Sequence, residues 1–384
     1  MNITIVADVL GTENNGTTIT IKRLINGLVE RGHKLTVVSP YKDEQSQNPK
    51  YLSVDIRNFG IVHSYIVKNG VELGKPDKET IRNAIEGADI VHIELPFKMG
   101  KAAAKICQEL DIPFTAGFHC QPENFSSHLG LKNSVLANKC LYLYYRNNFY
   151  KQVKHIHCPT QFIADELNKN NYKAKKYAIS NGVVPTYKKK DVEKPEEFKD
   201  KYLVLFIGRM SKEKRHDLLI KAMKHSKYSD KIQLVFAGCG PLEEKVIKMG
   251  SKLKNPPIIG FYTKEELSDI INYCDLYCHP SDIEIEAISC IEALTCGLVP
   301  VISNSPRSAT RFFAQDERSL FKVGDAKDLA KKIDYWIEHG DEKEQMSDVY
   351  IEYAKRFNID SCIDQMVEMF NEAIEEHKNI KKSK

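Results

Sequence analysis

Short apolar segments alternate with amphipathic segments along almost the whole sequence. ITIVADV at residues 3–9 predicts a strand, and residues 18–32 predict a helix because their apolar residues recur with a period near 3.6. HKLTVVSP at 33–40 predicts the next strand, and the same order recurs downstream. Single strands that alternate with single helices are typical of a parallel sheet with helices on both faces. The sequence therefore predicts an α/β fold.

The alternation breaks once, at residues 183–201. This segment, VVPTYKKKDVEKPEEFKDK, has two prolines, three consecutive lysines and mixed charge, which is typical of a linker. Because the alternation then restarts, we expect two Rossmann-like doubly wound domains whose carboxyl strand ends face a cleft. The predicted divisions are a first domain at 1–185, a linker at 186–200, a second domain at 201–360, and a C-terminal helix with a basic tail at 361–384 that packs back toward the first domain.

The composition indicates a globular protein, with 42% hydrophobic and 28% charged residues among 384. Asp8 interrupts the first apolar run and no basic segment precedes it, so we expect a strand there rather than a signal peptide, and a cytoplasmic protein. The ten cysteines form no C-x-x-C and no zinc spacing, which predicts reduced thiols and no metal site. Residues 1–190 carry a net charge of +9 and residues 191–384 one of −5. The basic half favours an anionic partner, and nucleic acid, a membrane surface and an anionic substrate all fit.

Two polar segments follow predicted strands of the first half. GTENNGTT at 11–18 contains Asn15 and Gly16, and such a turn lets backbone approach a ligand, although an ordinary strand-to-helix turn has the same composition. It does not match the dinucleotide pattern G-x-G-x-x-G. His119 comes just after a predicted strand, at the edge where functional residues gather. A purely structural histidine is the alternative.

The second half contains two similar strand ends. FIGRMSKEKR contains Gly208, Arg209 and Lys214, and a planar guanidinium beside an ammonium is suited to a diphosphate. A solvated basic loop is the alternative. FAGCGP contains Gly238 and Gly240, which permit close backbone approach.

A third segment, HPSDIEIEAISCIEAL, places acids at the start of a predicted helix. Glu284 and Glu292 have the spacing E-x7-E, and Glu286 lies between them. Carboxylates accept hydrogen bonds from sugar hydroxyls, and the amides of a helix start bind anionic oxygens. The alternative is a helix whose acids only favour its positive end.

The order of these motifs resembles the retaining nucleotide-sugar glycosyltransferases of the GT-B fold, the family of sucrose synthase, bacterial mannosyltransferases and glycolipid synthases. GRMSKEK resembles the family's G-R-x-x-x-E-K, AGCGPL its G-x-G-P-L, and the segment from Asp275 to Glu284 its D-x-x-x-x-P-S-x-x-E. The resemblance implies a catalytic group of His119, Arg209, Lys214 and Glu284. It implies a donor-binding group of Asn15, Gly16, Gly208, Gly238, Gly240, Ile285, Glu286, Ala287, Ile288 and Glu292.

Two positions depart from the family pattern. The family has E-G-F-G where this chain has Glu284, Ile285, Glu286 and Ala287, so side chains replace glycines where the donor sugar binds. Arg215 stands where glycine is usual, and we expect it to add a contact to phosphate.

The resemblance implies front-face transfer of a hexose from UDP-glucose or UDP-galactose, in which the leaving phosphate takes the acceptor's proton. The chain has no D-x-D run, so we expect no metal ion and no cofactor besides the nucleotide sugar. A UDP-sugar epimerase or hydrolase and a non-enzymatic nucleotide-sugar-binding protein are the alternatives. Nucleic-acid binding is not expected because no recognition motif is present.

An acid-free segment in the first half bears on the acceptor. Residues 124–164 lack Asp and Glu, and tyrosines and phenylalanines are interleaved with basic residues, which suits an anionic membrane surface. Alternatively, the aromatic residues pack inside the domain. We predict a membrane-associated acceptor, which is diacylglycerol or another glycolipid precursor. The protein would then act at the inner face of the cell membrane. A role in the assembly of capsule or cell-wall polysaccharide is the alternative. The predicted membrane contacts are Lys132, Lys139, Arg146, Lys151 and Lys154.

Overall fold

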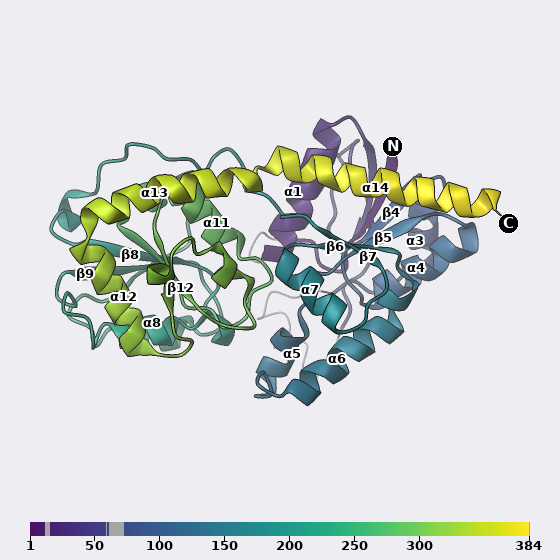
Figure 1. The fold of residues 1–384 in the computed structure, drawn as a ribbon. Helices are drawn as coiled ribbons and strands as arrows, with labels where there is room; N and C mark the ends of the chain where they lie inside the picture. The colour runs from purple at the N-terminus through teal and green to yellow at the C-terminus, as the bar shows by residue number, and fades with distance from the viewer. Residues whose placement is uncertain (12–15, 59, 61–72, 384) are drawn as a thin grey trace. The chain divides into compact units, whose positions relative to one another are not determined.

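The computed structural model describes residues 1–11, 16–58, 60 and 73–383. The chain forms two compact units (Figure 1). Unit 1 contains Met1–Asn181 and Ile359–Lys384, and unit 2 contains Gly182–Asn358. Each unit has one parallel sheet with helices packed against it, so the predicted α/β class is confirmed.

Unit 1 has a seven-stranded parallel sheet with the order β3-β2-β1-β4-β5-β6-β7. β1 pairs with β2 on one side and with β4 on the other, so the strand order reverses between β1 and β4. Ligands of doubly wound sheets bind outside the carboxyl ends of the strands at such a point. The strands are β1 (Asn2–Val6), β2 (Lys34–Ser39), β3 (Lys50–Ser53), β4 (Ile90–Ile93), β5 (Phe114–Gly117), β6 (His155–Cys158) and β7 (Lys175–Ala178).

Helices cover both faces of this sheet. Ile3 and Ile5 lie in one core with α1 and α14, whereas the intervening Thr4 donates a hydrogen bond to the Ala84 carbonyl of α3. Alternate strand residues point to opposite faces, so α1 and α14 lie opposite α3. The helices are α1 (Gly16–Glu30), α3 (Lys78–Ile85), α4 (Lys98–Leu110), α5 (Pro122–His128), α6 (Val135–Asn148), η2 (Tyr150–Gln152), α7 (Gln161–Lys169) and α14 (Ile359–Lys382).

The C-terminal helix α14 belongs to unit 1 and crosses its sheet beside α1 (Figure 1). A Cβ on Gly27 of α1 would lie 2.6 Å from Ile363, so only glycine permits this close packing. Arg31 pairs with Asp364 at 2.5 Å. We expected a short basic tail, but the helix continues to Lys382, where Lys381 pairs with Asp111 at 2.5 Å.

Unit 2 has a six-stranded parallel sheet with the order β10-β9-β8-β11-β12-β13. α8 packs on α12, and α11 packs on α13. The strands are β8 (Tyr202–Ile207), β9 (Ile232–Ala237), β10 (Ile258–Gly260), β11 (Leu276–His279), β12 (Pro300–Ser303) and β13 (Leu320–Phe321). The helices are η3 (Glu196–Phe198), η4 (Lys212–Lys214), α8 (His216–Ala222), α9 (Glu243–Gly250), α10 (Lys264–Tyr273), α11 (Ile288–Thr295), η5 (Ala309–Phe313), η6 (Glu317–Ser319), α12 (Ala326–Glu338), α13 (Gly340–Ala354) and η7 (Lys355–Phe357).

The segment that we predicted as a linker, 186–200, is part of unit 2. The Lys190 amide donates to Asn272 at 2.7 Å, and Lys194 pairs with Asp275 at 2.6 Å. Tyr187 is buried in the core of the unit. The lysines that suggested a solvated linker are thus tied to α10 and to the start of β11.

Candidate active site

Two glycine turns meet at the carboxyl edge of the unit 2 sheet. A Cβ on Gly238 would lie 2.4 Å from the Gly208 carbonyl oxygen, and one on Gly240 would lie 2.7 Å from the Met210 nitrogen. Both glycines have positive φ, 146° and 156°. We had interpreted them as allowing backbone to approach a ligand, but the close approach that the structure shows is between the two turns. They fix the loop that contains Arg209.

Lys214 and Glu284 form an ion pair at this edge. Lys214 Nζ lies 2.6 Å from Glu284 Oε1, and His279 Nε2 lies 3.2 Å from the same oxygen. Burial by itself raises the pKa of Glu284. The Lys214 charge and the His279 hydrogen bond outweigh burial and lower the pKa to about 2. Glu284 is therefore an anion across the physiological range.

The loop after β8 is less exposed than a solvated basic loop. Arg209 and Lys214 are both half-buried. Burial lowers the pKa of Arg209, whereas the charge of Glu213 raises it. A guanidinium and an ammonium held on one partly desolvated loop are suited to a diphosphate.

Arg215, for which we expect an added phosphate contact, is also engaged with acidic side chains of unit 2. Its guanidinium lies 3.0 Å from Asp217 and 3.5 Å from the buried Asp282. Its φ of 59° is left-handed, which explains why glycine suits this position.

The remaining donor-binding candidates lie around the start of α11. Ala287 caps the helix in a left-handed conformation with φ 61°. Glu286 and Glu292 are buried, and Ile285 and Ile288 are half-buried. The structure thus brings Gly208, Arg209, Lys214, Glu284 and this helix start together in unit 2.

His119 lies in unit 1, within a buried cluster of histidines. Its Nε2 lies 3.2 Å from Glu94 Oε2, and its ring lies 5.2 Å from that of His157. A Cβ on Gly117 would lie 2.5 Å from His119 Nε2, so glycine makes room for the ring. Burial raises the pKa of Glu94, but the neighbouring imidazoles lower it overall, whereas burial lowers the pKa of His92 to about 4. His119 thus faces one oxygen of this buried carboxylate, and His92 Nε2 lies 3.8 Å from the other.

Two further positions in unit 1 complete the sequence predictions there. Asn15 lies outside the described residues, and Gly16 is the first residue of α1. Asp8 follows β1 and accepts a hydrogen bond from the Met99 amide at the start of α4. Burial raises its pKa to about 7.

Our sequence interpretation missed His279 and Glu94. Glu94 directly follows a buried strand, which is the signal that singled out His119. His279 is the last residue of the apolar strand β11; its spacing of two from Tyr277 is the signal that could have found it, because residues two apart share a face.

The predicted membrane contacts lie in three different settings. Lys139 lies on α6 and Lys132 just before it, among exposed apolar side chains. Arg146 donates to the Asn170 carbonyl at 3.0 Å, and Lys154 lies 3.6 Å from Glu376 of α14. Lys151 is exposed on η2.

The aromatic residues of this segment follow the alternative that we had left open. Tyr142, Tyr145, Phe149 and Tyr150 are buried, and Tyr144 is exposed. In the described part of the chain, no helix has the length and apolar composition needed to cross a membrane.

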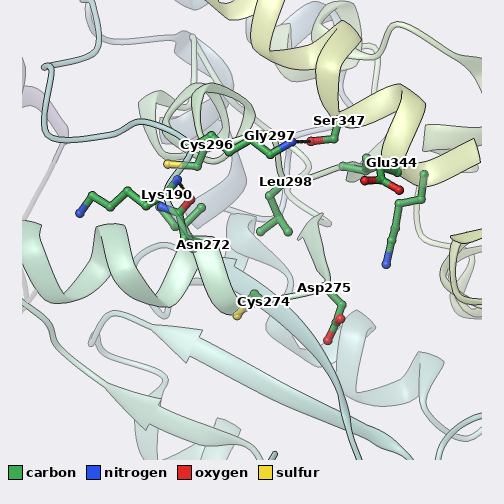
Figure 2. Close-up of a pocket in the computed structure, with 13 residues that line it drawn as sticks. Lys190, Asn272, Cys274, Asp275, Cys296, Gly297, Leu298, Glu344 and Ser347 are labelled. Atoms are coloured by element: carbon green, nitrogen blue, oxygen red, sulfur yellow. Dashed lines mark hydrogen bonds between the residues drawn. The ribbon is translucent and has the colours of Figure 1, made fainter. Parts of the chain in front are cut away.

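A cavity of about 240 Å³ lies at the opposite edge of the unit 2 sheet (Figure 2). Cys274, Asp275 and Val299, which line it, directly precede β11 and β12. Lys189 donates to Ser347 there at 3.4 Å. This cavity is separate from the residues at the carboxyl edge. Among the described residues, no group of three or more His, Cys, Asp or Glu has the geometry of a metal site.

Two families match this sequence in adjacent segments. Residues 14–187 match the family described as Glycosyltransferase Family 4, and residues 187–357 match Glycosyl transferases group 1. The chain is a glycosyltransferase of the GT-B fold.

Three proteins similar to this glycosyltransferase are each less than 25% identical to it. An uncharacterized glycosyltransferase of Methanocaldococcus jannaschii is 23% identical over 352 residues, which cover 91% of this chain and 92% of that protein. The alpha-monoglucosyldiacylglycerol synthase of Streptococcus pneumoniae is 24% identical over 230 residues, which cover 56% of this chain and 52% of that protein. The crystal structure of Alr3699/HepE from Anabaena, in complex with UDP and glucose, has a TM-score of 0.73 at 16% identity and covers 97% of this chain and 100% of that chain.

Proposed function

We propose that this glycosyltransferase moves glucose or galactose from a UDP-sugar to a membrane lipid, diacylglycerol or another glycolipid precursor, with retention of anomeric configuration. The observation that carries the donor half is the Lys214–Glu284 ion pair beside Arg209 at the carboxyl edge of unit 2. The Streptococcus pneumoniae relative, named for a glycolipid product, supports the acceptor class. The Anabaena structure, which holds UDP and glucose in the same fold, supports the donor class.

The contacts at the edge suit a nucleotide sugar. The Lys214 ammonium has three N–H donors, and Glu284 occupies one of them, so the others are available to a diphosphate. Glu284 would accept hydrogen bonds from sugar hydroxyls, and Glu292 from the ribose. In the transfer step the bond from C1 to the phosphate oxygen breaks while the acceptor oxygen bonds to C1 on the same face. The acceptor's proton passes to the leaving phosphate, whose charge Arg209 and Lys214 stabilise. This chemistry needs neither a metal ion nor a cofactor.

The donor and the mechanism are tested together. The protein is incubated with UDP-glucose, UDP-galactose or GDP-mannose and a membrane lipid extract, with and without EDTA, and the product anomer is assigned by NMR. We expect an acceptor-dependent release of UDP that EDTA leaves unchanged, and an α-linked product. Release of UDP without an acceptor would instead favour a hydrolase. Conversion of the donor sugar into its epimer, with no transfer, would favour an epimerase. If no UDP were released, a binding protein would be favoured. Glu284→Gln should lose about 100-fold in turnover, on the scale of other lost transition-state contacts, and the exposed Glu244→Gln is its control.

A surface formed by the segment between α5 and α6 and by the start of α6 supports the acceptor half. We define the α5–α6 surface as Leu129, Leu131, Val135 and Leu136 with Lys132 and Lys139. The exposed fractions of Leu129, Val135 and Leu136 are 75%, 81% and 72%. Exposed apolar side chains next to lysines match the interface of an anionic membrane, where the apolar groups insert and the lysines meet headgroups. This would place the protein at the inner face of the membrane.

Two variants separate the apolar and electrostatic contributions. Leu129→Ser with Val135→Ser and Leu136→Ser should weaken sedimentation with both neutral and anionic vesicles. Lys132→Ser with Lys139→Ser should weaken it only with anionic vesicles and reduce its salt dependence, because each lysine contributes about 1 kcal/mol near such a surface. Phe261→Ser, which removes an exposed aromatic side chain of unit 2, is the matched control. If the wild-type protein stayed in the supernatant with anionic vesicles, a soluble glycan in polysaccharide assembly would replace the lipid acceptor.

A further inference from the structure

A chain of buried polar side chains ends on Glu284. Ser289 Oγ donates to the Ile207 carbonyl at 3.1 Å and lies 3.3 Å from the Tyr277 hydroxyl. That hydroxyl lies 2.9 Å from His279 Nδ1, and His279 Nε2 lies 3.2 Å from Glu284 Oε1. Tyr277 and His279 are both 0% exposed. The chain therefore runs through the interior of unit 2 and reaches the site from behind.

The proton positions in this chain follow from its end groups. The Ile207 carbonyl only accepts, so the Ser289 proton is committed to it. At the other end Glu284 is an anion and only accepts, so the ring proton of His279 lies on Nε2, which faces it. Nδ1 of the neutral ring is then an acceptor and takes the hydrogen bond that the Tyr277 hydroxyl donates. Burial lowers the pKa of His279, although the hydrogen bond and charge of Glu284 raise it, so the ring is neutral and has this one tautomer.

The consequence for Glu284 is that its two oxygens differ. Oε1 accepts from Lys214 at 2.6 Å and from His279 at 3.2 Å. Within the described part of the chain, no hydrogen bond reaches Oε2. One oxygen is thus held from two directions, and the other is left to accept from a ligand.

We propose that His279 is a positioning residue: its Nε2–H, directed by Tyr277, fixes the Glu284 carboxylate so that Oε2 faces the donor sugar's hydroxyls. His279 is fully buried, so it acts through Glu284 and does not touch the substrate. This inference rests on the proposed role of Glu284 as a donor-sugar contact.

Three substitutions test the hydrogen bond itself. His279→Phe keeps a ring but removes the donor, and should lower kcat about 10- to 100-fold, the scale of a lost hydrogen bond to a charged group. The dissociation constant for UDP should change less than about twofold, because the sugar contact is affected and the nucleotide contact is not. His279→Gln retains an N–H near the Nε2 position and should recover most of the loss. Tyr277→Phe should give an intermediate loss of kcat, because without the Tyr277 hydroxyl the proton of the His279 ring can lie on either nitrogen.

A spectroscopic measurement and a control separate positioning from folding. The ¹⁵N signals of His279 should show the Nε2–H tautomer in the wild type and a mixture in Tyr277→Phe. His216 is a matched control, because it is also buried against Phe206 and, among the described residues, neither of its ring nitrogens has a hydrogen-bond partner. His216→Phe should therefore keep kcat within about threefold, as expected where no hydrogen bond is lost.

The outcomes distinguish the two proposals. If Glu284→Gln loses activity but His279→Phe does not, the positioning role is wrong and the role of Glu284 stands. If Glu284→Gln retains activity, the proposed donor contact itself is wrong. An equal loss in His216→Phe and His279→Phe would show that core disruption is the cause. If His279→Phe does not fold, His279→Gln and Tyr277→Phe decide, and wild-type turnover in Tyr277→Phe with an unchanged tautomer would overturn the inference.

Discussion

Lys214→Met tests whether the ion pair with Glu284 stabilises the fold as well as the site. Glu284 has a pKa of about 2 in the folded protein against 4.5 ordinarily. At about 1.4 kcal/mol per pH unit, the difference is about 3 kcal/mol. Because the folded pKa is lowered, this stabilisation is present above pH 4.5 and is lost as the pH falls toward 2.

Removing Lys214 leaves Glu284 as a buried carboxylate with no cation beside it. We expect Lys214→Met to lower the free energy of unfolding of unit 2 by about 3 kcal/mol at pH 7, because an unpaired buried charge costs that much or more. The deficit should shrink at pH 5, where the carboxylate of the variant takes up a proton. The double variant Lys214→Met with Glu284→Gln should recover most of the stability, because neither charge remains, but it should stay inactive.

The sequence offers a specific probe for this measurement. Its single tryptophan, Trp336, is fully buried in α12 of unit 2. Urea unfolding followed by tryptophan emission therefore reports on the unit that contains the ion pair. A loss below about 1 kcal/mol in Lys214→Met, the scale of an exposed ion pair, would refute the reasoning. So would a double variant as unstable as the single one.

Three further changes have defined expected results. Ala287→Gly should raise the free energy of unfolding of unit 2 by about 1 kcal/mol, and with it the urea midpoint, because φ is 61° and left-handed backbone costs alanine about that much; an unchanged midpoint would count against strain there. Gly27→Ala should destabilise unit 1 by about 1–3 kcal/mol despite alanine's better helix propensity, because its Cβ would lie 2.6 Å from Ile363; Ile363→Val in the same background should recover part of the loss in thermal unfolding. Asp8 has a pKa of about 7 in the folded protein against 3.8 ordinarily, so the folded state binds its proton more tightly than the unfolded state does. The free energy of unfolding should therefore fall by about 4 kcal/mol as the pH rises from 4 to 7. Asp8→Asn should flatten that pH dependence in unfolding followed by far-UV circular dichroism, and an unchanged slope would exclude Asp8 as its source.

The periodicity of the sequence predicted most of the strands and helices that build the two sheets. The sequence predictions were wrong where tertiary contacts order a segment whose local composition is typical of a linker or a tail. The 186–200 segment has the composition of a linker, but Lys190 and Lys194 bond to Asn272 and Asp275, far away in sequence. The predicted tail continues as helix because Lys381 finds a partner in Asp111 of unit 1. Composition cannot reveal a partner that only the fold supplies.

The candidate site shows the same division. Motif spacing singled out Lys214 and Glu284, and the structure places their charged atoms 2.6 Å apart. The spacing did not reveal what holds them: His279 lies inside an apolar strand, and its spacing of two from Tyr277 places both on one face without showing that they are bonded. Nor did it show that Gly238 and Gly240 serve the packing of two turns.

Two of the positions that depart from the family pattern share a physical character. Arg215 and Ala287 stand where the family has glycine, and both keep the left-handed backbone that favours glycine, with φ of 59° and 61°. Arg215 offsets the strain through its ion pairs with Asp217 and Asp282. Asp282 belongs to the loop that precedes Glu284, and its amide donates to the Glu213 carbonyl at 2.9 Å. Arg215 thus connects the loop that contains Lys214 to the loop that contains Glu284. Arg215→Gly would relieve the backbone strain at this position, but it would also loosen the Lys214–Glu284 ion pair, on which donor binding is proposed to depend.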